Sequence, residues 1–256
     1  MAQKIAFNTA NLVGRVSGYR FKLKDWGRQH DRTAAETDAA AWTGICADIA
    51  AAGYHAAEVW IAHVDPRFVN EAQARQRRRI AADAGIDIVA LAAPCTPDTA
   101  RIAAWMDVEV LNGGLWGTDL EQVKSIVRAG GVRWNFENHP EKSAPEILDK
   151  IGGGSERIGV CIDTGWLGSQ QVNAPALIRE LGSLVRHVHV KDVLPDTHQT
   201  CLLGQGAVNV EACLATLHEI GYAGWYSWED EPEGRNPLDT AVENRLWLER
   251  TLRRTQ

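Results

Sequence analysis

Two short apolar runs, Val132-Arg-Trp-Asn-Phe-Glu137 and Ile158-Gly-Val-Cys-Ile-Asp163, decide the fold of this chain. Both are rich in β-branched and aromatic residues, which favour strands, and both end on a carboxylate. Between them, Ser143-Ala-Pro-Glu146 has the capping-box pattern of a helix start, and the glycines at 152–154 end that helix. A strand, a helix and a second strand form a βαβ unit, which predicts two parallel strands.

The same alternation of strand and helix patterns continues through the whole chain. The expected strands cover residues 4–8, 55–60, 86–92, 107–112, 132–137, 158–163, 184–189 and 225–229. Strict alternation favours a parallel sheet, and 256 residues are the usual length of one barrel of eight strands with an outer layer of helices. Because no linker or low-complexity stretch divides the sequence, we expect an α/β fold, a single (β/α)8 TIM barrel, with one domain at 1–256.

The composition restricts the classes of function. The chain is 45% hydrophobic and 23% charged, with a formal net charge of −6. Nucleic-acid affinity depends on clustered positive charge, so we expect no nucleic-acid partner. No apolar run is long enough to span a membrane, and the first residues lack a signal-peptide core, so we expect no membrane partner either. Together with five scattered cysteines, these features indicate a cytoplasmic protein.

Side chains that can bind a metal follow the last four expected strands. Glu137, Asp163 and His189 are spaced 26 residues apart, and Glu229 follows His189 by 40 residues. Each interval fits a strand, a crossover helix and the next strand. In a closed parallel barrel the carboxyl ends of all strands meet at one rim, where the active sites of such barrels lie. We therefore predict that these four residues bind a divalent cation.

Each of the four residues also has a simpler interpretation when it is taken singly. Asp163 could cap the helix after its strand, His189 could be a hydrogen-bonded histidine at the rim, and the acidic run that starts at Glu229 could be a solvated face. The metal site is favoured because independent solvated charges need not fall at the same place in four consecutive βα units.

Longer motifs around these positions resemble a known family. The motifs are Phe136-Glu-Asn-His-Pro140, Val160-Cys-Ile-Asp-Thr-Gly165, His187-Val-His-Val-Lys-Asp192, Leu203-Gly-Gln-Gly-Ala-Val208 and Gly221-Tyr-Ala-Gly-Trp-Tyr-Ser-Trp-Glu229. In order and spacing they are similar to the xylose-isomerase-like TIM-barrel superfamily, the sugar phosphate isomerase/epimerase group. The resemblance is concentrated in residues 130–230, with a shorter match at Gly53-Tyr-His-Ala-Ala-Glu-Val-Trp60. It implies that Glu137, Asp163, His189 and Glu229 are the metal ligands.

The ligand types indicate both the cation and the reaction. Three carboxylates and one imidazole favour a hard divalent ion, so we expect one Mn²⁺ per chain, with Mg²⁺, Co²⁺, Fe²⁺ and Zn²⁺ as alternatives. Such an ion polarises a carbonyl and stabilises an enediolate. We therefore expect a sugar isomerase or epimerase that abstracts a proton next to a carbonyl. The resemblance supports Glu137 and Glu229 as catalytic acid and base; His139 is a third catalytic candidate, or else a cap of the following helix.

Further residues near strand ends are candidates for substrate binding: Glu58, His63, Asn112, Trp166, His187 and Lys191. Glu58 matches an acidic position of the family after the second strand, and its alternative role is an ion pair with a rim arginine. His187 lies on the same side of its strand as His189, as a substrate contact or a buried hydrogen-bonded group. Lys191 could bind substrate oxygens or pair with Asp192. The long connections at 9–37 and 190–208 are expected to border the rim, the first as a lid.

Two departures from the family pattern keep a second function open. Trp166 stands where many relatives have His, and Ser143 stands where keto-sugar 3-epimerases have a second Glu. The alternative is a metal-dependent lyase or dehydratase that performs β-elimination on a keto-sugar, a keto-inositol or a 3-keto-glycoside. An AP-endonuclease-like phosphodiesterase is disfavoured by the acidic composition, and a non-catalytic sugar-binding module by the complete four-residue set. The expected partner is a small sugar or keto-sugar, and a homo-oligomer is compatible with the sequence.

Overall fold

The computed structural model describes residues 3–195 and 197–255, and within these ranges eight parallel strands form a closed barrel in chain order. The strands are β1 (Ile5–Asn8), β2 (Ala56–Trp60), β3 (Asp87–Ala92), β4 (Val110–Gly113), β5 (Arg133–Glu137), β6 (Ile158–Asp163), β7 (Val185–Val190) and β8 (Tyr226–Trp228). Strand β1 pairs with both β2 and β8, which closes the barrel. The predicted (β/α)8 TIM barrel is confirmed, and seven of the strands begin within one residue of their predicted starts.

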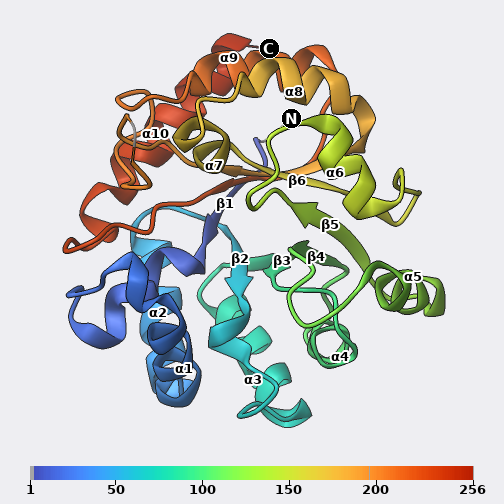
Figure 1. The fold of residues 1–256 in the computed structure, drawn as a ribbon. Coiled ribbons are helices and arrows are strands. Elements are labelled where there is room, and N and C mark those ends of the chain that lie inside the picture. Colours follow the sequence, from blue (N-terminus) through green and yellow to red (C-terminus); the bar gives the residue numbers. More distant parts are fainter. Residues whose placement is uncertain (1–2, 196, 256) are drawn as a thin grey trace.

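Helices surround the strands (Figure 1). They are α1 (Trp26–Glu36), α2 (Ala39–Ala51), α3 (Glu71–Asp83), α4 (Pro97–Trp105), α5 (Leu120–Ala129), α6 (Ala144–Ile151), α7 (Thr164–Ser169), α8 (Ala174–Leu181), α9 (Val210–Glu219) and α10 (Leu238–Thr255), with short 3-10 helices η1 (Thr9–Ser17), η2 (Leu23–Asp25), η3 (Ile61–Val64) and η4 (Gly182–Leu184). The outer helices bury one apolar face each against the sheet, as Trp42, Ile45 and Ile49 of α2 do.

Helix α6 begins where the sequence predicts, although its cap differs in one detail. The Ser143 hydroxyl accepts a hydrogen bond from the Glu146 N–H at 3.4 Å, which is the expected N-cap bond. The Glu146 carboxylate, however, accepts from the N–H of Lys142 at 2.8 Å, and not from Ser143 as a capping box would have it. The glutamate thus holds the residue before the cap and fixes the direction in which the chain enters the helix.

The aromatic side chains of the last strand pack into the core. Trp228 is fully buried, with its ring 5.4 Å from that of Phe7 and stacked on Tyr54 at 6.0 Å. A ring in that position cannot meet a substrate. Trp228 therefore has the commoner role of an aromatic side chain in a barrel, which is core filling.

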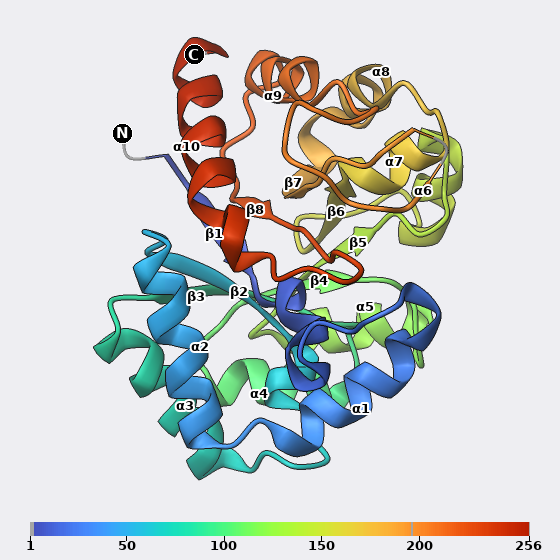
Figure 2. The ribbon, with the colours of Figure 1, turned by 90° about the vertical axis from the view of Figure 1, so that its left-hand side faces the viewer.

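The connection at 9–37, expected to be a long loop, is mostly helical. It contains η1, η2 and α1, and the Asn8 side chain caps η1 by accepting from the Ala10 N–H at 3.0 Å. Figure 2 shows this blue segment next to the red connection that follows β8. There the Glu233 carboxylate accepts from the Leu23 N–H at 2.7 Å and pairs with Lys22 at 2.9 Å. The segment is therefore tied to the opposite end of the chain; its action as a lid stays a prediction.

The connection between β7 and α9 is organised by one buried carboxylate. Asp192 accepts four backbone N–H bonds: Oδ1 accepts from Val193 at 2.9 Å and Val208 at 3.0 Å, and Oδ2 from Gly204 and Gly206 at 2.9 Å each. Asp192 is 1% exposed. It was expected to bind substrate or to pair with Lys191, and instead it folds the connection back onto the end of its own strand.

We predict that Asp192→Asn loosens this connection. The amide has one acceptor oxygen, so two of the four buried N–H groups lose their partner, and each such loss costs about 1–3 kcal/mol. Urea unfolding should show a lower free energy of unfolding, and hydrogen exchange should rise within 193–208. Asp119→Asn is the control, because Asp119 caps α5 through one exposed bond and Asn caps equally well. Unchanged exchange in 193–208 would contradict the assignment.

Candidate active site

Four buried side chains meet at the carboxyl ends of the last four strands. Glu137 and Asp163 are the final residues of β5 and β6, His189 is the penultimate residue of β7, and Glu229 directly follows β8. One ligand atom from each lies within 4.8 Å of the others, and all four residues are buried. The structure thus brings together the four residues that the strand-end spacing singled out.

His189 lies at the centre of this group. Its Nδ1 is 2.7 Å from Glu137 Oε1 and 3.0 Å from Glu229 Oε2. Asp163 approaches from the neighbouring strand, and its Oδ1 accepts from the N–H groups of Gly165 at 2.7 Å and Trp166 at 3.0 Å. Asp163 therefore caps α7 with one oxygen and directs the other into the cluster. The predicted roles as a helix cap and as a member of the cluster do not exclude each other.

Lys191 follows strand β7, and its ammonium lies among the carboxylates. Its Nζ is 2.8 Å from Glu231, 3.3 Å from Asp163 and 3.6 Å from Glu229. Burial alone would lower the pKa of Lys191, but these carboxylates outweigh it and hold the pKa well above its usual value. The rim therefore concentrates enough negative charge to keep a buried cation in place.

The donor set fits a divalent cation. Within the described residues, the buried Glu229 Oε2 has no hydrogen-bond donor, although His189 Nδ1 lies 3.0 Å away. Burial would raise the pKa of Glu229, but Lys191 and His189 outweigh it and keep the carboxyl ionised. A buried anionic oxygen without a donor, facing two further carboxylates and an imidazole nitrogen, is an arrangement that a hard cation satisfies.

His139 lies on the wall of the same site. Its Nε2 is 3.7 Å from Asp163 Oδ2, and its ring meets the Trp166 ring edge-on at 4.4 Å. The Nε2 atom is buried without a hydrogen-bond partner in the described structure. The alternative role as a helix cap does not apply, because Ser143 caps α6. His139 is placed to exchange a hydrogen bond with a molecule in the site.

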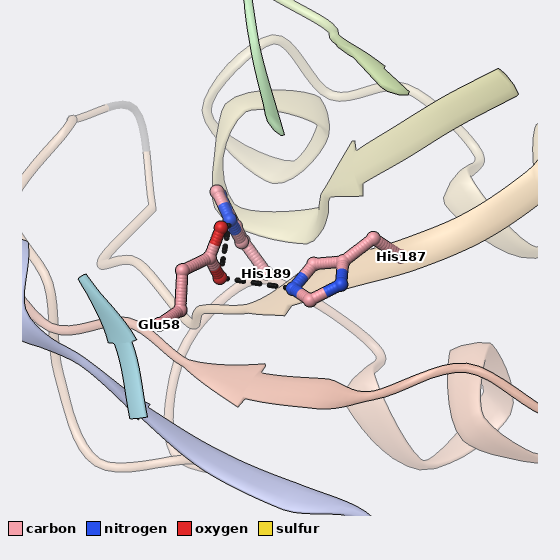
Figure 3. A group of neighbouring side chains, drawn as sticks. All are labelled: Glu58, His187 and His189. Carbon is pink, nitrogen blue, oxygen red and sulfur yellow. Dashed lines mark hydrogen bonds and ion pairs between the residues drawn. The ribbon is translucent and has the colours of Figure 1, made fainter. Parts of the chain in front are cut away.

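Glu58 and His187, both expected to contact the substrate, lie behind His189. Figure 3 shows Glu58 between the two imidazoles, with Oε2 at 2.9 Å from His187 Nε2 and 3.0 Å from His189 Nε2. Oε1 accepts from Asn112 Nδ2 at 2.7 Å. Neither Glu58 nor His187 is among the described residues that line the cavity. The alternative prediction for Glu58 was an ion pair with a rim arginine, but its partners are the two histidines. Burial would raise the pKa of Glu58, yet the two histidines hold it well below its usual value.

His63 is also placed away from the site. It is 1% exposed, and its ring nitrogens lie 3.2 Å from the Thr9 carbonyl and 3.3 Å from the Thr37 hydroxyl. Burial lowers the pKa of His63 to about 3, so the imidazole is neutral. It joins η3 to η1 and to the C-terminal end of α1. The expectation of a substrate contact therefore finds no support in its position.

A cavity of about 1100 Å³ opens above the cluster. Asn112, Trp166 and Lys191 line it, as the sequence suggested, together with Glu137, His139, His189 and Glu229. Beyond the substrate-binding candidates named above, the described lining also includes His30, Asp65, His198 and Glu231, and Trp26 from the connection at 9–37. Glu231 belongs to the acidic run after β8. Because alternate side chains of an extended chain point to the same side, its position two residues after Glu229 could have indicated that it faces the cavity. The other four come from connections, where no periodicity predicts direction.

Within the described residues, no helix combines the length and the apolar character that a membrane crossing requires.

Comparisons with known proteins agree with the fold. The family model for the xylose isomerase-like TIM barrel matches residues 115–251. The L-ribulose-5-phosphate 3-epimerase UlaE of Salmonella paratyphi C (strain RKS4594) is 38% identical over 64 residues, which cover 24% of this chain and 22% of that relative. The solved structure of an L-ribulose 3-epimerase has a TM-score of 0.72 at 16% identity and covers 99% of this chain and 96% of that chain. The probable 3-DHS dehydratase AsbF from Bacillus anthracis gives a TM-score of 0.65 at 12% identity, covering 96% and 99%. At these identities the two structures share the fold.

We predict that the cluster binds Mn²⁺ and that this binding stabilises the fold. At a free Mn²⁺ concentration of 100 Kd, the stabilisation is about 2.7 kcal/mol. For a chain of this size it should raise Tm by about 5–10 °C. His189→Ala should fold but show no rise, and the exposed His218→Ala is the matched control that keeps it. A full Mn²⁺-dependent rise in Tm of His189→Ala would place the ion elsewhere.

Proposed function

The chain belongs to the xylose isomerase-like TIM-barrel family, and we propose that it is a metal-dependent sugar isomerase or epimerase. It moves a proton on the carbon next to a sugar carbonyl. The observation that carries this proposal is the meeting of Glu137, Asp163, His189 and Glu229 next to a cavity of about 1100 Å³, which Glu137, His189 and Glu229 line. Local similarity to a sugar phosphate 3-epimerase supports the same class of reaction.

The four residues would hold the divalent ion, with Mn²⁺ favoured by the hard carboxylate ligands. Bound there, the ion supplies a Lewis acid that polarises a carbonyl and makes the neighbouring C–H more acidic. Asp163 is suited to a purely structural share in this site, because its Oδ1 is already occupied by the N-terminus of α7. Glu137 and Glu229 have no such second bond to a helix and are free to face the substrate.

Glu137 and Glu229 are the acid–base pair of the proposal. Burial would raise the pKa of each carboxyl, but neighbouring groups outweigh it: His189 lowers the pKa of Glu137, and Lys191 and His189 lower that of Glu229. Both are therefore ionised at neutral pH and can accept a proton. They come from β5 and from the residue after β8, three strands apart in the barrel. One carboxylate can thus remove a proton and the other can return one.

His139 and Lys191 complete the proton and charge balance. The unpartnered Nε2 of His139 can hydrogen-bond a sugar hydroxyl or pass it a proton. Lys191, held by Glu231, places its ammonium beside Glu229 and helps to keep that carboxylate ionised. These roles use side chains that line the cavity and touch the cluster.

A lyase is the second candidate, favoured by the size of the cavity. The same proton abstraction on a keto-sugar, a keto-inositol or a 3-keto-glycoside is followed by loss of the group on the β-carbon, as water or as an aglycone. A cavity of about 1100 Å³ leaves room for such a group beside the sugar. Trp166, which replaces a polar residue common in relatives, lies on its wall.

Glu137→Gln tests the chemistry, because an amide has no lone pair basic enough to take the proton. On the true substrate we expect kcat to fall by about 10²–10⁴-fold. In D₂O, wild-type enzyme should place deuterium on the carbon next to the carbonyl, and the variant should not. Glu121→Gln, the same change on the exposed face of α5, is the control.

Mass spectrometry on a panel of keto-sugars separates the two candidates. Product and substrate have equal mass for an isomerase or epimerase, whereas a lyase product has lost water or an aglycone. Full activity of Glu137→Gln would move the base to Glu229 or His139. Metal-independent turnover, or none on any keto-sugar, would contradict the proposed function itself.

A further inference from the structure

The cavity above the cluster has two aromatic walls. On one side the Trp60 ring lies 5.3 Å from Trp26 and 5.2 Å from His30. On the other side His139 lies 5.6 Å from Trp116, and Trp166 lies 4.7 Å from His198. All of these side chains line the cavity, and Trp116 is 52% exposed. Its volume of about 1100 Å³ reaches the upper end of the range for sites that bury drug-sized ligands, which are larger than one sugar ring.

The charges of the cavity do not suit a phosphate group. Among the described lining residues the fixed cations are Arg67 and Lys191, and both are already paired. Arg67 bonds Asp65 at 2.8 Å and Asp31 at 2.9 Å, and Lys191 is surrounded by carboxylates. The carboxylates of the lining outnumber these cations: Asp65, Asp98, Glu137, Glu229 and Glu231. A phosphate would have to break an existing ion pair to reach either of these side-chain cations.

Resting on the proposed function, we propose that the substrate is an uncharged keto-sugar that carries an aromatic or otherwise apolar substituent, in the manner of a keto aryl glycoside, and not a sugar phosphate. The sugar ring lies over the carboxylate cluster. The substituent lies against the wall formed by Trp116, His139 and Trp166, where an exposed indole offers a stacking face. This wall is continuous with the cluster, because His139 Nε2 lies 3.7 Å from Asp163.

Equilibrium binding tests this subsite without requiring turnover. The probes are 4-nitrophenyl β-D-glucopyranoside, methyl β-D-glucopyranoside and D-ribulose 5-phosphate, titrated calorimetrically into Mn²⁺-supplemented protein. We expect the aryl glucoside to bind at least about tenfold tighter than the methyl glucoside, and the phosphate to bind weakest. Trp116→Ala and Trp166→Ala should each reduce the aryl preference. Phe68→Ala should keep it, because Phe68 is an exposed aromatic residue outside the described cavity lining.

The outcomes separate this proposal from the proposed function. Equal affinity for the two glucosides, tighter binding of ribulose 5-phosphate, or an aryl preference that survives both tryptophan variants would overturn the subsite. None of these results bears on proton abstraction, because the glucosides have no carbonyl. Absence of metal-dependent turnover on every keto-sugar would instead overturn the proposed function.

A second inference comes from the buried network behind His189, shown in part in Figure 3. Glu58 Oε2 accepts from both His187 Nε2 and His189 Nε2, and its Oε1 is held by Asn112 Nδ2. Asn112 is held in turn by Asn135 Nδ2, which donates to its Oδ1 at 2.8 Å. Glu58 and Asn112 are fully buried and Asn135 almost so. Both carboxylate oxygens of Glu58 are therefore held by buried hydrogen bonds.

The hydrogen bond to Glu58 decides which nitrogen of His189 is free. In the neutral, metal-binding form of His189 the proton is on Nε2 and directed at Glu58, and the lone pair is on Nδ1, which faces Glu137 and Glu229. The geometry points to Glu58 as a positioning residue that sets the tautomer and ring orientation of His189 for a cation. Partners of this kind typically change metal affinity by 10–100-fold.

Metal binding measures this role directly. We expect Glu58→Gln to weaken Mn²⁺ binding about 10–100-fold, measured by calorimetry, and to change the visible spectrum of the Co²⁺ form. Glu141→Gln is the control, because Glu141 is buried at the same rim but bonds the His139 N–H and not His189. Wild-type affinity in Glu58→Gln would overturn the inference.

Metal stoichiometry of the wild-type protein provides a test that does not depend on the variant folding. Glu58, His187 and His189 together could themselves hold an ion, because their ligand atoms also lie within 4.8 Å. One ion per chain supports the positioning role, since it leaves Glu58 as a hydrogen-bond acceptor. Two ions per chain would make Glu58 a ligand of a second metal and overturn the proposal.

Discussion

Mutual repulsion among Glu137, Asp163 and Glu229 is the constraint on which the rim depends. Closure of a parallel barrel brings these strand ends together and buries them, and like charges in a poorly solvated place are unstable without compensation. The structure supplies compensation from His189 at the centre, from Lys191 beside it and from the N–H groups of α7. A divalent cation bound among these carboxylates would complete the compensation. The proposed chemistry uses the negative charge that the protein itself leaves unbalanced, because that charge would hold the cation.

The compensating groups also restrict what can enter the cavity. Because Lys191 is engaged by Asp163 and Glu231, it is not available to a phosphate, and Arg67 is engaged by Asp65. Recognition must then come from hydroxyl hydrogen bonds and from the aromatic walls. The same barrel fold supports epimerases and dehydratases, so the lining of the cavity, and not the barrel, selects the substrate.

Much of the fold could be predicted because the alternation of strand and helix patterns, and the polar residues at the ends of the strands, can be read from short stretches of sequence. The spacing of Glu137, Asp163 and His189 predicted their meeting, since consecutive strands of a parallel barrel are neighbours. The contact of Glu58 with His187 and His189 was not predictable in this way, because it crosses the barrel from β2 to β7 and depends on inward side-chain packing. The helices within 9–37 were missed because their many charged residues hide the few buried positions, such as Gln29 and Thr33 of α1.

Anomalous diffraction from a crystal grown with Mn²⁺, recorded on both sides of the manganese absorption edge, tests the central claim most directly. The account predicts one strong peak at the rim, about 2–2.3 Å from oxygens of Glu137, Asp163 and Glu229 and from Nδ1 of His189. Glu58 should keep its hydrogen bond to Nε2. A peak elsewhere, or none at the rim with Lys191 still filling the carboxylate cluster, would contradict the account.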